Sequence, residues 1–223
     1  GNHITTSKIE HPAILETCKT LERQGFEVSY INVNEDGIID VEELRKSIKT
    51  NTILISVMTA NNEVGTVQPI EEIAKIAHDN NIVFHTDAVQ AIGNVRIDVE
   101  KMKIDMLSLS SHKINGPKGV GALYIKNGIE VEKFINGGHQ EKDRRAGTEN
   151  VAGIVGIGKA AEIARKNMET HIRNLSKIRD YYIKKVQKEI PNIRINGSME
   201  NRLPGNANIS FKGINASELI FKL

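Results

Sequence analysis

The chain has 223 residues and a formal net charge of +2, with 39% hydrophobic and 26% charged residues. This balance is typical of a globular protein and excludes a strongly basic nucleic-acid surface, while 4% aromatic residues without tryptophan are too few for base stacking. No apolar run approaches the roughly 18–20 residues that span a bilayer, so neither a membrane nor a nucleic-acid partner is expected. The single cysteine, Cys18, excludes internal disulfides and favours a reducing, cytoplasmic compartment.

Short β-branched runs alternate with amphipathic helical stretches in the first part of the chain. In chain order we predict a strand entered at His3, a helix from Pro12 to about Gln24, a strand over Phe26–Tyr30, a helix over Val41–Ile48, a strand over Thr52–Met58, a helix from Pro69 to about Asn80, and strands over Ile82–His85, Asp105–Ser110 and Gly121–Ile125. Strands that alternate with helices predict an α/β fold, in which a mostly parallel sheet is flanked by helices.

After Gly147 the pattern changes to a long, charged, helix-prone stretch over Val151–Glu189. Because this exceeds an ordinary globular helix, a break is predicted near Asn167–Asn174. The remaining predicted elements are strands over Ile193–Ile195 and Ala207–Phe211, followed by a helix capped by Ser217. We therefore expect a large domain over residues 1–165, incomplete at its N-terminus, and part of a small α+β domain over residues 166–223, with both ends being cuts in a longer protein.

Residues 32–43, NVNEDGIIDVEE, come close to a calcium-binding loop, with Gly37 at its sixth position and Glu43 at its twelfth. Such a loop must be entered by a helix, yet the preceding residues alternate like a strand. The sequence therefore favours a turn at residues 35–37 followed by a helix with an acidic first turn.

Polar residues follow three successive predicted strands: Asn62 after one, Asp87 after the next, and Lys113 after a third. Ligands bind at the carboxyl ends of strands in open α/β sheets. A lysine held there can bond covalently to the carbonyl group of a cofactor when its environment lowers its pKa. The alternative for Lys113, taken from this stretch alone, is a solvated loop residue.

Five motifs appear in order along the chain: HPAIL at 11–15, NNEVG at 61–65, HTDAVQ at 85–90, SSHK at 110–113 and RRAGTEN at 144–150. Their order and spacing resemble the class V, fold-type I enzymes that use pyridoxal 5′-phosphate (PLP). More narrowly, the motifs resemble the cysteine desulfurases of the NifS and IscS kind. The resemblance covers essentially the whole chain.

The resemblance implies roles for three catalytic or ring-binding residues. Lys113 would hold the cofactor covalently and, once freed, would move protons as a base. Asp87 would pair with the pyridine nitrogen and keep it protonated, so that the ring acts as an electron sink. His11 would stack on the ring and take part in proton transfer. The alternative for both Asp87 and His11 is a polar residue at a helix N-terminus.

The resemblance also implies further cofactor contacts. Gln90 would donate a hydrogen bond to the ring hydroxyl oxygen, and Asn62 would bind near that oxygen and the substrate carboxylate, although a turn also explains Asn62. Ser110 and His112 would hold the phosphate. Thr148 of a partner subunit would complete this phosphate site, which implies a homodimer; the alternative for Thr148 is a polar loop that caps the long helix.

The implied reaction removes sulfur from L-cysteine to give L-alanine and an enzyme persulfide, for transfer to a sulfur acceptor in iron–sulfur cluster assembly or tRNA thiolation. In the family the nucleophilic cysteine lies beyond the position of Leu223. Cys18 does not match it, because Cys18 lies inside a predicted helix without a clear activating cation. We therefore expect this chain alone to be inactive. The alternatives are a selenocysteine lyase, another class V aminotransferase, or a non-catalytic fragment or scaffold.

Overall fold

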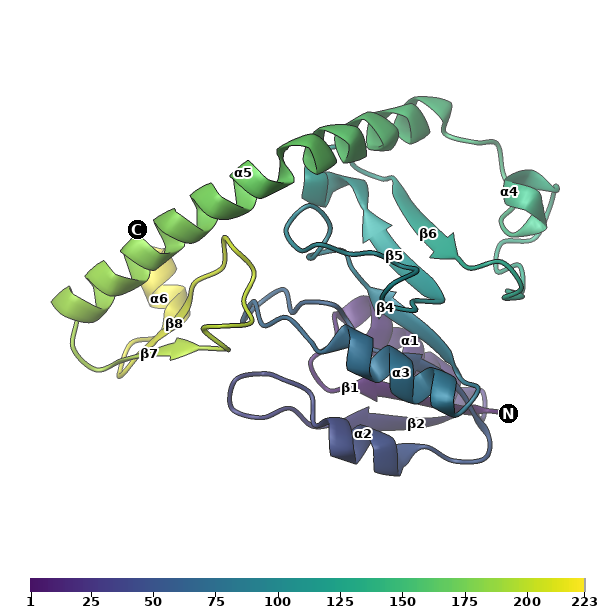
Figure 1. The fold of residues 1–223 in the computed structure, drawn as a ribbon, viewed down its shortest axis with the longest axis horizontal. Helices are drawn as coiled ribbons and strands as arrows, with labels where there is room; N and C mark the ends of the chain where they lie inside the picture. The colour runs from purple at the N-terminus through teal and green to yellow at the C-terminus, as the bar shows by residue number, and fades with distance from the viewer. Residues whose placement is uncertain (223) are drawn as a thin grey trace.

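The computed structural model describes residues 1–222, and its main feature is a six-stranded sheet with the order β2-β1-β3-β4-β5-β6 (Figure 1). Its strands are β1 His3–Ser7, β2 Glu27–Ile31, β3 Thr52–Ser56, β4 Val83–Asp87, β5 Met106–Ser110 and β6 Gly121–Ile125. Strands β1 to β5 run parallel to their neighbours, and β6 runs antiparallel to β5. The predicted α/β fold with a mostly parallel sheet is confirmed.

Three helices connect the first strands: α1 (Pro12–Arg23), α2 (Val41–Ser47) and α3 (Ile70–Asp79). In Figure 1, α3 lies in front of the sheet and α1, drawn fainter, lies behind it. Helix α3 buries one apolar face and exposes Glu71 and Glu72 in its first turn. The core between helices and sheet is aliphatic around a single fully buried phenylalanine, Phe84.

The segment that resembles a calcium loop is a turn between β2 and α2. The Asn34 side chain accepts hydrogen bonds from the backbone of Asp36 and Ile38, both at 3.0 Å. Asp40 caps α2 by accepting from Glu43 N at 2.9 Å, and the first turn of α2 is acidic. The predicted turn and acidic helix are confirmed, since these oxygens are used to hold the backbone.

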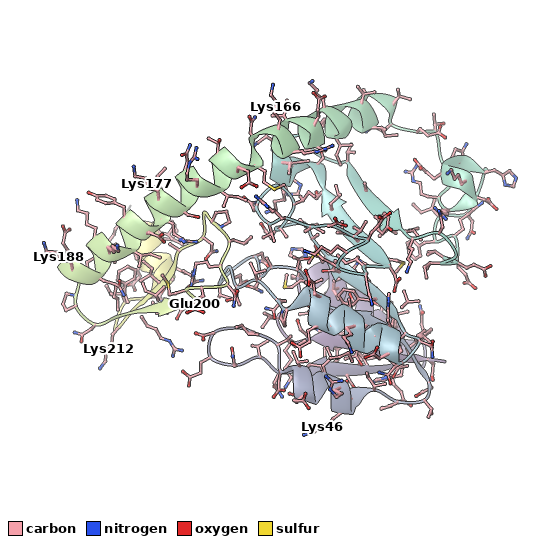
Figure 2. All side chains as sticks on the ribbon, in the orientation of Figure 1. Lys46, Lys166, Lys177, Lys188, Glu200 and Lys212 are labelled. Atoms are coloured by element: carbon pink, nitrogen blue, oxygen red, sulfur yellow. The ribbon has the colours of Figure 1, made fainter. Side chains whose placement is uncertain are left out.

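Helix α5 (Val151–Glu189) is one uninterrupted helix of 39 residues, so the predicted break is wrong. Residues 167–174 contain neither proline nor glycine, the usual causes of a sharp kink. The helix packs against η1 (Ser111–Ile114) after β5 and, further along, against the C-terminal unit, where Arg179 Nη1 donates to Leu203 O at 3.1 Å and Ile183 and Val186 are buried. Its outer face is charged, and Figure 2 shows Lys166, Lys177 and Lys188 pointing away from the molecule.

The C-terminal residues form the antiparallel pair β7 (Ile193–Asn196) and β8 (Asn208–Phe211), then the short helix α6 (Ala216–Ile220). Helix α6 begins two residues earlier than predicted: Asn215, not Ser217, is its cap and accepts from Ser217 N at 2.9 Å. The division at residues 165 and 166 stays a prediction, and α5 is continuous across it. None of the helices within residues 1–222 combines the length and hydrophobicity that a bilayer span requires.

Candidate functional site

The carboxyl ends of β1, β3, β4 and β5 meet at one edge of the sheet, because these neighbouring strands are parallel. Backbone hydrogen bonds continue beyond the strands: Thr59 N donates to Asp87 O and Ala88 N donates to Ser108 O, both at 2.9 Å. The segments that follow these strands are thus held side by side. They carry the predicted residues His11, Asn62, Asp87, Gln90, Ser110, His112 and Lys113.

Asp87 is the last residue of β4 and is buried. Its Oδ1 accepts a hydrogen bond from Val89 N at 2.9 Å, whereas Oδ2 has no hydrogen-bond partner within residues 1–222. The alternative role at a helix N-terminus is not met, because a turn and not a helix follows β4; Asp87 holds the backbone of this turn with only one oxygen. The other oxygen remains available for a ligand.

A buried histidine, His85, lies two residues before Asp87 on the same face of β4. Its Nδ1 pairs with Ser56 Oγ at 2.8 Å on β3, and its Nε2 pairs with Ser108 Oγ at 2.9 Å on β5. Burial lowers the pKa of His85 to about 4, and the nearby Asp87 only partly opposes this. Below Asp87 the sheet therefore presents a neutral imidazole. Sequence reasoning assigned His85 no role; the signal was a serine in each of the two adjacent apolar strands.

Lys113 lies in a short 3-10 helix, η1 (Ser111–Ile114), directly after β5. Just before it, Ser110 Oγ and His112 Nδ1 are 2.7 Å apart. His112 and Lys113 are exposed, and Lys113 borders a cavity of about 210 Å³ between η1, residues 92–94 and α5. The structure brings an amine, an imidazole and a hydroxyl group together at the end of one strand.

Helix α5 fixes the glycine-rich turn that follows η1. A Cβ added at Gly153 would lie 2.4 Å from Val120 Cγ2, and one added at Gly156 would lie 2.4 Å from Pro117 Cγ. The two glycines therefore allow the helix to approach the turn closely. This packing positions η1, and with it Lys113, against a rigid element.

His11 caps helix α1: its Nδ1 accepts a hydrogen bond from Ala13 N at 3.1 Å. The helix-terminal alternative is thus correct for the backbone-facing nitrogen. A neutral ring that accepts at Nδ1 must carry its proton on Nε2. Since His11 is exposed, this N–H can still face a ligand.

The turn after β3 is held by Asn61 rather than by Asn62. Asn61 is buried, donates to Ile9 O at 2.8 Å, and accepts from Glu63 N and Val64 N at 2.9 Å. The side chains of Asn62 and Gln90 are half-buried and form no hydrogen bond within residues 1–222. Both amides therefore remain free to bind a ligand, as their predicted roles require.

Thr148 lies apart from this set, in the exposed loop between α4 (Gln140–Asp143) and α5. The long helix is capped instead by Asn150, whose side chain accepts from Gly153 N at 3.1 Å. In Figure 1 this loop joins α5 at its end beside α4, away from β1. The role of Thr148 toward a partner subunit stays a prediction.

Comparison with known proteins gives a consistent result. The model of the family described as Aminotransferase class-V matches residues 1–223. The cysteine desulfurase IscS of Dictyoglomus turgidum is 49% identical over 223 residues, which cover 100% of this chain and 57% of that protein. The chain thus spans a little more than half the length of this curated relative.

Solved structures agree in fold. A "NifS-like protein" superposes with a TM-score of 0.94 at 40% identity, covering 98% of this chain and 60% of that one. A structure described as "SspA in complex with cysteine" superposes with a TM-score of 0.83 at 38% identity, covering 99% of this chain and 61% of that one.

The residues at the carboxyl edge fit the cofactor that this family uses. Ser110 and His112 supply donors suited to a phosphate, and Asp87 keeps one carboxylate oxygen without a hydrogen-bond partner among residues 1–222. Lys113 supplies an exposed primary amine one residue further on. With a family model that covers every residue, and with this donor set in place, the chain belongs to the class V aminotransferase family, whose enzymes depend on PLP.

Proposed function

We propose that the whole protein is a PLP-dependent cysteine desulfurase, which converts L-cysteine to L-alanine and an enzyme-bound persulfide. The observation that carries this proposal is the placement of Asp87 and Lys113 at the ends of the adjacent strands β4 and β5. The named relatives and the neighbour described with cysteine support the substrate. The activity is proposed for the whole protein because this chain spans 57% of that relative.

Binding and orientation of the cofactor fall to three side chains. PLP, when bound, supplies an electron sink for the negative charge that develops on the substrate. Asp87 would accept a hydrogen bond from the pyridine nitrogen through Oδ2 and favour the protonated ring. Ser110 and His112 would donate to the phosphate, since their hydroxyl and imidazole groups already lie together.

Proton transfer falls to Lys113 and His11. The Nζ atom of Lys113 would bind the cofactor and, when free, would carry a proton between the substrate atoms. The Nε2 atom of His11 is the nitrogen left for proton exchange, because Nδ1 is held by the first turn of α1. Asn62 and Gln90 would position the substrate and the ring oxygen with their free amides.

The sulfur-accepting thiol is proposed to be a cysteine other than Cys18. Burial, with a smaller contribution from the carboxyl groups of Glu10 and Glu22, raises the pKa of Cys18 to about 11. A thiol in this state is a poor nucleophile. The persulfide would pass to an acceptor in iron–sulfur cluster assembly or tRNA thiolation, in the reducing cytoplasm that suits a free thiol.

A homodimer is proposed as the working form, with Thr148 reaching the phosphate site of its partner. Several large apolar side chains between β6 and the start of α5 are exposed, which supports a second copy covering this region: Leu123, Phe134, Ile135, Val151 and Val155. A closed two-fold pair would bring each copy's loop to the other copy's site.

The experiment that tests the function compares Asp87→Asn with Asp79→Asn, an exposed control on α3. The whole protein is assayed for alanine and sulfide release from L-cysteine, with PLP binding followed by absorbance. We expect Asp87→Asn to bind PLP but to lose about 100-fold or more of its turnover, the scale for one group that stabilises developing charge. Asp79→Asn should retain turnover within about 2-fold, because an exposed carboxylate away from the site stabilises no developing charge. Undiminished turnover in Asp87→Asn would refute the assigned role.

A further inference from the structure

Glu10, the residue before His11, is a buried carboxyl group that the proposed reaction does not use. It is 4% exposed. Its Oε1 accepts hydrogen bonds from Ser7 Oγ at 2.6 Å and from Met58 N at 2.9 Å. Its Oε2 is buried and has no hydrogen-bond partner within residues 1–222. The side chain therefore joins the end of β1 to the segment after β3 through one of its two oxygens.

A second bond strengthens this connection, since Asn61 Nδ2 donates to Ile9 O at 2.8 Å. The two side chains thus hold residues 8–11, which lead into α1, against residues 57–61, which follow β3. His11 stands at the end of the first of these segments. Its place at the carboxyl edge depends on this pair of cross-links.

The charge state of Glu10 follows from its surroundings. A buried carboxylate oxygen without a donor is strongly disfavoured. Burial raises the pKa of Glu10 to about 7, although its bonds to Ser7 and Met58 act in the opposite direction. The titratable groups that face it are Asp87 at the end of β4 and Cys18 on α1, and neither supplies a positive charge.

We propose that Glu10 is a positioning residue: its carboxyl group, carrying a proton on Oε2, locks the loop that presents His11 against the end of β3. This inference rests on the proposed function, because the position of His11 matters to catalysis only if PLP binds at the carboxyl edge of the sheet.

The test uses Glu10→Gln, which keeps an acceptor oxygen without a titratable proton, and Glu10→Ala, which removes the cross-link. Glu16→Gln, on the exposed face of α1, is the control. The parent is the protein without a substitution. In each cofactor-free protein, the NMR chemical shift of the Met58 backbone amide is measured as a function of pH, because that N–H donates directly to Glu10. A step at near-neutral pH is expected in the parent and in Glu16→Gln, and no step in Glu10→Gln. No step in the parent, or a step near the ordinary glutamate pKa, would overturn the neutral carboxyl.

Two measurements test the positioning role: the NMR signal of the His11 ring and the affinity of the protein for PLP. Glu10→Gln should retain a single sharp His11 ring signal and bind PLP within about 2-fold of the parent. Glu10→Ala should broaden or split that signal and weaken PLP binding at least about 10-fold. Equal losses in both variants would contradict a neutral positioning group, as would full PLP affinity in Glu10→Ala. If Glu10→Ala does not fold, Glu10→Gln and the Met58 titration decide.

Failure of the proposed function gives a different pattern from failure of this inference. A parent protein that binds no PLP, but shows the Met58 step and the sharp His11 signal, refutes the cofactor site and leaves the loop assignment standing. A parent that binds PLP at Lys113 with no Met58 step refutes the assignment of Glu10 alone.

Discussion

At the scale of single residues, the carboxyl edge combines polar groups whose charge is set by burial. Asp87 stands over a neutral His85, whose two nitrogens are both used by serines of the neighbouring strands. Burial raises the pKa of Glu10, whose Oε2 has no hydrogen-bond partner within residues 1–222, and so favours the neutral carboxyl group. Neither group places a positive charge beside Asp87, whose Oδ2 has no hydrogen-bond partner within residues 1–222 and can accept from a protonated ligand nitrogen.

Cys18 gives a prediction at this scale. Its raised pKa, about 11, and its burial predict alkylation by iodoacetamide at pH 8 at least about 100-fold slower than for an unperturbed cysteine, because the thiolate is the reacting form. The rate is measured by mass spectrometry of the intact chain. The same chain in urea is the control and should react like a free cysteine. Rapid labelling of the folded chain would contradict the assignment of Cys18 as an inert thiol.

The residues that sequence reasoning could find are those whose motif is local. His11, Asp87 and Lys113 were identified from short segments, and the structure places each at the carboxyl edge of the sheet. Glu10 and His85 were missed because their partners come from remote strands: Met58 for Glu10, and Ser56 and Ser108 for His85. No local pattern reveals that such partners will meet.

At the scale of elements, the site depends on how α5 packs against the turn after η1. A Cβ added at Gly156 would lie 2.4 Å from the ring of Pro117, which cannot move aside like a flexible side chain. Gly158, two residues later in the same helix, is exposed and has nothing near its missing Cβ. The two glycines therefore separate the effect of packing from the effect of helix propensity.

We predict opposite effects of alanine at these two positions. Gly156→Ala should lower the free energy of unfolding by about 1–3 kcal/mol, because the new methyl group meets Pro117. Gly158→Ala should raise it by about 0.5–1 kcal/mol, because glycine is the poorer helix former. Urea unfolding of both variants measures the difference. Equal stabilisation by the two substitutions would show that α5 does not pack closely against Pro117 in the turn after η1.

Helix and strand positions followed from periodicity, while their ends and interruptions did not. The length of α5 suggested a break, but packing against η1 and the C-terminal unit and the absence of proline or glycine in residues 167–174 keep it whole. The start of α6 lies two residues earlier than predicted, because the side chain of Asn215, not that of Ser217, accepts the hydrogen bond from the first turn. Where a helix ends, and which residue caps it, depends on three-dimensional contacts that a sequence pattern does not contain.

At the scale of the whole molecule, Glu10 and His85 affect stability against pH in opposite directions. The pKa of Glu10 is raised from 4.5 to about 7, so its contribution is present below pH 4.5 and is lost as pH rises to 7. The pKa of His85 is lowered from 6.5 to about 4, so its contribution is present above pH 6.5 and is lost as pH falls to 4. Each amounts to about 3 kcal/mol, and the two largely offset each other in mildly acidic solution.

Replacing Glu10 should reveal the pH dependence of the unfolding free energy that His85 contributes. Glu10→Gln should lose up to about 3 kcal/mol more than the parent when the pH is lowered from 7 to 4.5, because only the His85 effect remains. The quantity to measure is the difference in unfolding free energy between variant and parent at each pH, so that other titrating groups cancel. Glu16→Gln should follow the parent profile. Parallel profiles for Glu10→Gln and the parent would contradict the raised pKa of Glu10.

The most direct test of the central claim is to locate the cofactor on the chain. The protein is incubated with PLP, reduced with borohydride, digested and mapped by mass spectrometry, alongside Lys113→Ala and Lys118→Ala, a neighbouring exposed lysine. The account predicts a single dominant PLP adduct on Lys113, lost in Lys113→Ala and unchanged in Lys118→Ala. A folded protein that gives no adduct, or one whose adduct is spread over surface lysines and persists in Lys113→Ala, would contradict it.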